Sequence, residues 1–417
     1  MRGRMRIGLV ILVTFVLVAA AACASNTIGS SGSRVASPRA AKASPEQLRA
    51  QFEQFLGQHA LLAVRLMRSV VSPAPDLRQA ATVSLRQNTE ALSRIVASAY
   101  GRAQGDLFTQ LWQRHITDLL DYANTVARHD ASAQQTARAA LMADANAYGS
   151  WFAGASKGRV GAGEAAAGVR MHVEELMAQL DAYAARDYQR AYQIERTAYE
   201  HMFTAGAALA KASVPPELAI GLDSPPNKLR SAFAMLLGEH LELIVDAQRA
   251  TFAGSPEFNA AAAQLNANTT ALAQAMGTIV GVKQAAEFQS AWADHVSGLM
   301  AYTTAVAGKD KAGQDAAENR LNSFAVTLAA YFGNVVHNQR DVVPLTGAII
   351  THDRHLIDQV NAYAAKDYAK AEQMQLDGYQ QMLDVANTLV DAIQRAVQRG
   401  LPAGGSQTGG GGTARRP

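Results

Sequence analysis

Apolar residues recur at intervals of three and four, rather than two, from about residue 46 to near the end of the chain. This spacing places the apolar side chains on one face of an α-helix. Abundant alanine favours helix as well, and no segment has the alternation or β-branched density of a strand. In the first half the pattern predicts six helices, at about 46–71, 77–99, 105–129, 131–155, 160–185 and 187–212. The sequence therefore predicts an all-α fold built of antiparallel helical bundles.

The helical pattern occurs twice. "LRAQFEQFLGQH", which begins at Leu48, matches "LRSAFAMLLGEH", which begins at Leu229, at an offset of 181 residues. The offset becomes 180 after the next connection, and "YAARDY" at Tyr183 then matches "YAAKDY" at Tyr363. A self-match of this length is typical of internal duplication. We therefore expect two tandem bundles of about six helices each.

These matches define the predicted domain organisation. We name residues 45–213 the first repeat and residues 226–400 the second repeat. Segments rich in Ser, Gly, Ala or Pro flank and join them, and such compositions cannot bury a core. The flanking and joining segments are a signal peptide, a flexible tether, a Pro-rich linker and a disordered Gly-rich tail, at 1–22, 23–44, 214–225 and 401–417.

The N-terminus has the features of an export signal. Arg2, Arg4 and Arg6 precede an apolar run at 7–22, which ends at Cys23, the only cysteine of the chain. A basic start, a short apolar run and a cysteine after small residues predict a bacterial lipoprotein with a palmitate-bearing Cys23. An ordinary secreted protein or an uncleaved anchor are the alternatives. We expect an exported cell-envelope protein, lipid-anchored to the extracytoplasmic face of the cell membrane.

Composition limits the partners of the mature chain. The sequence holds 38 Lys and Arg against 35 Asp and Glu, and three of the arginines lie in the predicted signal. The remaining charges balance, so nothing indicates a nucleic-acid-binding surface. A single cysteine forms no internal disulfide, so apolar burial must stabilise the fold.

Three helices of the first repeat place a histidine on the apolar stripe, and a fourth places an asparagine there. These residues are His59, His115, His172 and Asn88. The second repeat has the same residue types at the matching positions, His240, His295, His352 and Asn268. Six of the ten histidines of the chain thus form three matched pairs, far more than chance placement gives. We therefore expect one buried polar cluster in each bundle.

Three interpretations of the clusters follow. A buried polar group without a partner costs about 1–3 kcal/mol, so the clusters must satisfy each other, hold water or bind a ligand. In the first interpretation, the histidines and the asparagine form a hydrogen-bond network that only specifies the fold. In the second, three neutral imidazoles hold a transition metal such as Cu or Zn. A small organic ligand or an unexpected enzyme is the third.

Several polar neighbours are weaker candidates for the same site. Glu175 and His355 lie three residues after the last histidine of each repeat, so each could add a metal ligand, although a solvent-facing position is equally compatible. Surface placement is expected for Gln58, Glu239, Arg114, Asp294, Glu195, Gln375, Tyr199 and Tyr379, with a role behind the ligands as the alternative. Trp112 and Trp292 are expected in the core. His129, His201 and His337 are expected at the surface.

These residues also resemble a helical-bundle repeat of exported Gram-positive and actinobacterial proteins and lipoproteins, sometimes found beside copper-amine-oxidase N-terminal-like domains. That family has an acid-His pair on its first helix, a Gln-Asn pair on its second and single histidines later. The matching residues are Gln58-His59, Glu239-His240, Gln87-Asn88, Ala267-Asn268, His115, His295, His172 and His352. Departures at Gln58 and Ala267 leave open whether both repeats bind alike. The resemblance implies a helical bundle and export, and it implies no activity.

The preferred prediction is a non-catalytic, metal-binding lipoprotein with one histidine site in each bundle. The main alternative is a structural or protein-binding module whose histidine and asparagine clusters only specify the fold. An oxidoreductase that uses a metal in the core is a further class, and it would need a route for substrate to reach the metal.

Overall fold

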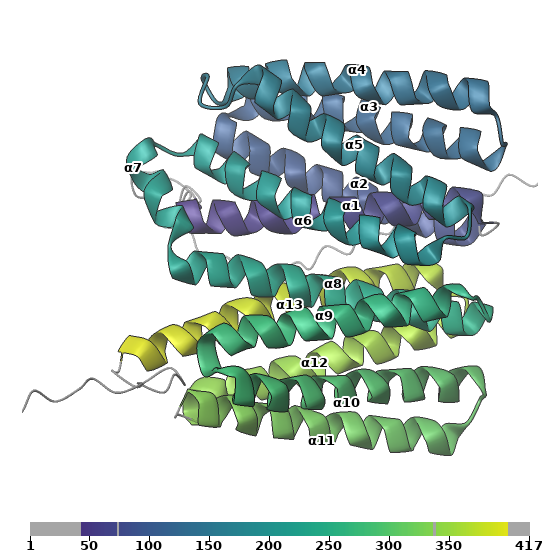
Figure 1. Ribbon diagram of the computed structural model, residues 1–417, viewed down its shortest axis with the longest axis vertical. Helices are drawn as coiled ribbons and strands as arrows, with labels where there is room; N and C mark the ends of the chain where they lie inside the picture. Colours follow the sequence, from purple (N-terminus) through teal and green to yellow (C-terminus); the bar gives the residue numbers. More distant parts are fainter. Residues whose placement is uncertain (1–42, 73–74, 337–338, 399–417) are drawn as a thin grey trace, which may run out of the picture. The chain divides into compact units, whose positions relative to one another are not determined.

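The computed structural model describes residues 43–72, 75–336 and 339–398. The predicted signal peptide, Cys23 and the Gly-rich tail lie outside the described residues. Within them, all regular structure is helical, which confirms the predicted all-α class (Figure 1). The helices are α1 Pro45–Val71, α2 Pro75–Tyr100, α3 Arg102–Ala127, α4 Ala131–Ala155, α5 Ala162–Ala184, α6 Tyr188–Ser213, α7 Pro216–Ala219, the 3₁₀ helix η1 Ile220–Asp223, α8 Pro225–Ala253, α9 Glu257–Val280, α10 Val282–Ala307, α11 Lys311–Val335, α12 Gln339–Ala364 and α13 Tyr368–Gln398.

Short polar residues set the helix starts. Ser44 forms a capping box with Gln47 at the start of α1, with each side chain bonded to the other residue's backbone N–H. Asp187 accepts a hydrogen bond from the backbone N–H of Arg190 and begins α6, as expected from the sequence. In the matched "YAARDY" and "YAAKDY" turns, Arg186 and Lys366 have φ of 62° and 61°. These left-handed residues end one helix so that the next can begin directly.

Each repeat is organised around its first helix. Helix α1 contacts α2, α3, α5 and α6, and α8 contacts α9, α10, α12 and α13 in the same way. Helices α3 and α5 are thereby both held against α1, which brings side chains from these three helices to a common point. Small residues allow this close packing. A Cβ on Gly57 of α1 would overlap the ring of Phe203 on α6.

The predicted linker contains local structure. It carries α7 and η1, and Leu222 of η1 is fully buried. The side chain of Arg49 in α1 donates to the backbone carbonyl of Leu222. Both repeats belong to one compact unit. Independent folding of each repeat stays a prediction.

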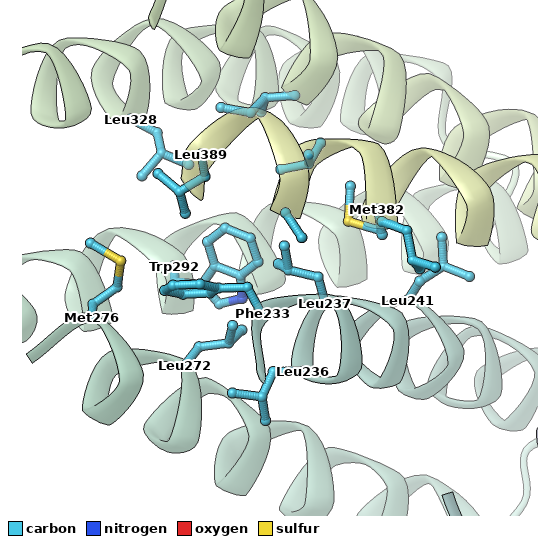
Figure 2. Packing of buried hydrophobic residues seen from close by; sticks show 14 of the residues in the cluster. Phe233, Leu236, Leu237, Leu241, Leu272, Met276, Trp292, Leu328, Met382 and Leu389 are labelled. Atoms are coloured by element: carbon cyan, nitrogen blue, oxygen red, sulfur yellow. The ribbon is translucent and has the colours of Figure 1, made fainter. Parts of the chain in front are cut away.

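The hydrophobic packing also crosses between the repeats. One large cluster is made mainly by the second repeat but includes Leu61, Tyr192, Tyr199 and Phe203 of the first. Figure 2 shows the interior of this cluster, where Trp292 and Phe233 are surrounded by aliphatic side chains. The aliphatic residues labelled around them include Leu272, Met276, Leu328 and Leu389.

Charged side chains are also buried where α1, α6, α8 and α13 meet. Arg65 of α1 forms an ion pair with Glu242 and another, at 2.7 Å, with Glu372. Arg68 lies 2.5 Å from Glu195 and 3.1 Å from Asp246. We name this set the interface network. Its charged members are Arg65, Arg68, Arg249, Glu195, Glu242, Asp246, Glu257 and Glu372.

In the part of the chain that the structure describes, no helix combines the length and the apolar character that a membrane span requires.

Candidate metal centre

The first repeat brings three histidines from separate helices together. His59 of α1, His115 of α3 and His172 of α5 are 0%, 2% and 4% exposed. Their ring centroids lie 5.6, 5.7 and 5.9 Å apart, and one ring nitrogen of each lies within 4.8 Å of the other two. We name this group the first triad. The helical periodicity of the sequence predicted that these three side chains face one core.

The second repeat builds the same group at the matching positions. His240 of α8, His295 of α10 and His352 of α12 have ring centroids 5.6 to 5.7 Å apart. One nitrogen of each again lies within 4.8 Å of the others, and all three side chains are buried. We name this group the second triad.

The histidines of the triads have almost no hydrogen-bond partners in the protein. Both ring nitrogens of five of them are buried and unpartnered, as is Nε2 of His240. Nδ1 of His240 accepts a hydrogen bond of 3.3 Å from Nε1 of Trp292. A neutral imidazole that accepts at Nδ1 carries its proton on Nε2, so this bond competes with metal binding through Nε2. The equivalent nitrogen of Trp112 in the first repeat has no partner.

Burial keeps the triads neutral. It lowers the pKa of His115 to about 4, an effect that Asp144 partly offsets, and it lowers the pKa of His240 to about 3. Burial, followed by the neighbouring histidines, also lowers the pKa of His59, His172, His295 and His352. Neutral imidazole is the form that binds a metal, so each ring has a lone pair available at pH 7.

The side-chain nitrogens of the asparagines on the apolar stripes hold neighbouring helices together. Asn88 donates to the carbonyl of Phe55 and to Oε1 of Gln58, both at 2.9 Å. Asn268 likewise bonds the carbonyl of Leu236 and the Glu239 carboxyl. Oδ1 of each asparagine, the atom that would bind a metal, is buried without a partner, so the role of Asn88 and Asn268 as additional ligands stays a prediction. The hydrogen bonds that the structure describes also do not connect either asparagine to a histidine.

The triads have the chemistry and approximate spacing of a metal site. Three nitrogens at about 2.0–2.1 Å from a tetrahedral ion lie about 3.4 Å from one another. The observed nitrogens are within 4.8 Å of one another, so the rings would move inward by at most about an ångström to reach one ion. Direct hydrogen bonds between imidazoles need about 3 Å, and the described residues show none within a triad. Binding one ion would therefore satisfy a lone pair on each of the three rings with a smaller movement than direct hydrogen bonds between the rings would need.

Each repeat also places one buried carboxyl beside its central histidine, and the two come from different helices. Asp353 of α12 lies 3.5 Å from Nδ1 of His295, and burial raises the pKa of this carboxyl well above its usual range. Asp144 of α4 is buried near His115 and is bonded to Arg114 at 2.7 Å. A carboxyl behind a histidine ligand orients its ring. Asp144 follows Leu141 at the helical interval, so its place on the core-facing stripe of α4 could be read from the sequence. Its counterpart in the second repeat is Phe324, so the comparison of the two repeats did not indicate it.

Glu175 and His355 lie outside the triads. Glu175 pairs with Nδ1 of His201 at 3.1 Å, and His355 is half-buried with an unpartnered Nδ1. The prediction that His201 lies at the surface was wrong, because its side chain is 14% exposed and turns toward α5. His129 is exposed as expected, and His337 lies outside the described residues.

Of the other residues that were expected at the surface, some are exposed and the rest are buried. Arg114 and Asp294 have half or more of their side chains exposed, as expected. Gln58 and Glu239 are buried, because they receive the asparagine side chains of the neighbouring helix. The remaining residues of that group are buried as well, because the other repeat covers their helix face; they are Glu195, Gln375, Tyr199 and Tyr379.

The tryptophans are in the core as predicted, and they also contact the triads. The ring centroid of Trp112 lies 4.4 Å from that of His59, and that of Trp292 lies 4.9 Å from that of His240. Each indole forms one wall of its triad.

Comparisons of this chain with protein-family models, with curated protein sequences and with solved structures gave no match. The resemblance to the exported helical-bundle repeat stays a prediction.

Proposed function

We propose that the protein is a lipid-anchored cell-envelope protein that binds one transition metal ion, Cu or Zn, at each histidine triad. The observation that carries this proposal is a set of buried, neutral imidazoles without partners. An unsatisfied buried polar atom costs about 1–3 kcal/mol, and each triad concentrates at least five such nitrogens in one place. A single ion coordinated by three of them offsets much of that cost.

The donor set favours borderline and soft ions. Three neutral nitrogens suit Zn and Cu, whereas Mg and Ca prefer oxygen ligands. Three histidines also leave one position of a tetrahedral ion open, as in catalytic zinc sites. The proposed role is binding, since the described residues around each triad do not position a second reactant beside the ion.

Metal stoichiometry tests the proposal directly. Protein prepared without an affinity tag, stripped with chelator and reloaded with Zn(II) or Cu(II), should retain two ions per chain by native mass spectrometry. His115→Ala and His295→Ala should each retain one, and the double variant none. His129→Ala is the matched control, because this histidine is exposed and distant from the core helix faces, and it should retain two.

The melting temperature provides a second test of metal binding. A ligand that binds only the folded state raises the melting temperature, so Zn(II) or Cu(II) should raise Tm in wild type and by less in each single variant. The structural alternative predicts that wild type arrives free of metal, ignores both ions, and is destabilised equally by His115→Ala with and without chelator. That pattern would reject the metal proposal.

A further inference from the structure

The two triads differ in what surrounds them. A cavity of about 300 Å³ ends on His115 and His172 of the first triad. The matching space beside His295 and His352 of the second triad is about 30 Å³. Except for Phe324, every residue that lines the second space matches a residue that lines the first, so side chains at matching positions can be compared directly.

Side-chain volume explains the difference. At four matching positions the first repeat has the smaller residue. The pairs are Val96 and Met276, Ala165 and Leu345, Val169 and Ile349, and Ala205 and Val385. Leu345 and Val385 add the methyl and methylene groups that occupy the space in the second repeat. Figure 2 shows Met276 and Leu328 among the side chains around Trp292 in the second repeat.

The cavity of the first repeat has a mostly aromatic and aliphatic wall and a polar inner end. Phe52, Phe108 and Trp151 contribute aromatic surface. At the inner end, Nε1 of Trp112 and the hydroxyl of Tyr148 are buried without partners, as are the nitrogens of His115 and His172. The residue that matches Tyr148 in the second repeat is Leu328, which offers no polar group. Unpartnered polar atoms at the end of an apolar cavity are typical of a small-molecule site.

The cavity also reaches the surface between α5 and α6. Exposed residues, among them Glu164 of α5 and Thr204 and Ala208 of α6, line its outer part. A molecule can therefore approach the first triad from solvent. In the second repeat, the aliphatic side chains of Leu345 and Val385 occupy the matching space.

Size and polarity define the molecule that fits. An apolar cavity of about 150 Å³ holds benzene, so twice that volume accommodates two aromatic rings. Among the described residues that line the cavity, the only carboxylate, ammonium or guanidinium group is that of Glu164 at the rim, so a multiply charged ligand would be poorly solvated. A metal on three neutral histidines has an open position that a nitrogen or oxygen donor fills.

We propose that the first repeat, and not the second, binds a compact aromatic molecule whose single nitrogen or oxygen donor coordinates the metal held by His59, His115 and His172. This inference rests on the proposed metal function. It makes the first triad a ligand-accessible centre and the second a closed one.

The test uses the full chain loaded with Co(II), whose visible absorption reports on the fourth ligand of a tetrahedral site. The probe is 4-phenylimidazole, which has two rings and one donor nitrogen. We expect titration to shift the spectrum of one of the two cobalt ions per chain. His115→Ala should remove that shift, and His295→Ala should leave it.

A closing variant, which fills the cavity of the first repeat, is obtained by introducing residues of the second repeat at the matching positions. Ala165→Leu combined with Ala205→Val should still load two cobalt ions but weaken binding of the probe by tenfold or more. The matched control is Ala167→Leu, which makes the same change at an exposed position of α5 outside the cavity wall. In the opposite direction, Leu345→Ala with Val385→Ala should give the second cobalt a response to the probe, which keeps the test decisive if the closing variant fails to fold.

The failures are distinguishable. If the wild-type chain binds no cobalt, the proposed metal function fails and the inference fails with it. If two cobalt ions bind but the probe changes neither spectrum or changes both equally, the inference is overturned while the metal function stands. A response of the closing variant equal to that of wild type would also overturn it.

Discussion

The hydroxyl oxygens of Tyr199 and Tyr379, which occupy the same position in the two repeats, lie 2.9 Å apart where the repeats meet. The surrounding helices pair in a matching way. Helix α6 of the first repeat packs on α9 of the second, and α13 of the second repeat packs on α2 of the first. Equivalent surfaces thus face each other, as they do in a two-fold symmetric dimer. Gly238 makes room for this contact, since a Cβ there would overlap the hydroxyl of Tyr199.

The tyrosine pair should stabilise the contact between repeats. Tyr379→Phe should lower the free energy of unfolding by about 1 kcal/mol, because it leaves the hydroxyl of Tyr199 without its partner. Tyr199→Phe should cost less, because the hydroxyl of Tyr379 keeps its 3.4 Å hydrogen bond to the carbonyl of Gln54. The double variant should cost less than the sum, which a double-mutant cycle in urea measures. Tyr100→Phe is the control. Its hydroxyl bonds the carbonyl of Leu209 within the first repeat, so its effect should add independently to that of Tyr199→Phe.

Arg65 should matter far more than an exposed ion pair. Its side chain is buried between Glu242 and Glu372, so Arg65→Met leaves two buried carboxyls without this cation and should cost about 3–5 kcal/mol. Lys311→Met removes an ion pair with Asp315 whose side chains are 77% and 55% exposed, and it should leave stability almost unchanged because water screens this pair. Chemical denaturation of both variants compares the costs. Equal small losses would show that the interface network is solvated.

The interface network should also give stability a pH dependence. Burial, together with the neighbouring acids, raises the pKa of Glu195 to about 8 from an ordinary value of 4.5. Between these values the folded state binds more protons than the unfolded state, so this group's contribution to stability grows as pH falls from 8 to 4.5 and is lost as pH rises through 8.

Glu195→Gln isolates that contribution. The variant cannot titrate at this position, and the two proteins are otherwise identical in sequence. The difference in unfolding free energy between wild type and variant should therefore shift against wild type by up to about 1.4 kcal/mol per unit as pH rises from 6 to 8. A difference that is constant over this range would mean that Glu195 stays ionised beside Arg68.

The repeats should fold separately and then recombine. Fragments 44–215 and 224–400 each contain a complete triad and a complete set of apolar stripes, so each should show a helical circular dichroism spectrum. Mixing them should give a one-to-one complex by light scattering, because both hydrophobic and charged contacts join them. A fragment that remains unfolded until its partner is added would mean that the two repeats share one core.

Anchoring is tested at the N-terminus. If Cys23 carries the lipid, Cys23→Ser should move the protein from the membrane fraction to the soluble fraction, since acyl chains supply the hydrophobic attachment. Retention of an uncut N-terminus in the membrane fraction would instead indicate that residues 7–22 remain as an anchor.

The helices and the triads were accessible from sequence for a simple reason. A stripe at helical spacing determines which side chains face inward, and His59, His115 and His172 each lie on such a stripe. The pattern cannot say what covers the opposite face of a helix. Glu195 and Tyr199 were therefore expected at the surface, although the other repeat buries them. Cavity size was inaccessible for a related reason, because it depends on how several small volume differences combine in three dimensions.

The interface network has a consequence for how copies of this chain assort. Arg68 faces Asp246, which occupies the position of Arg65, so two first repeats brought together in the same way would oppose arginine to arginine. Two second repeats would set Asp246 against Glu242 and Glu372, the acids that Arg65 neutralises here. Each half is thus matched to the other and mismatched to itself. The charge pattern therefore favours pairing of a first repeat with a second repeat, within one chain or between two chains, over pairing of two like repeats.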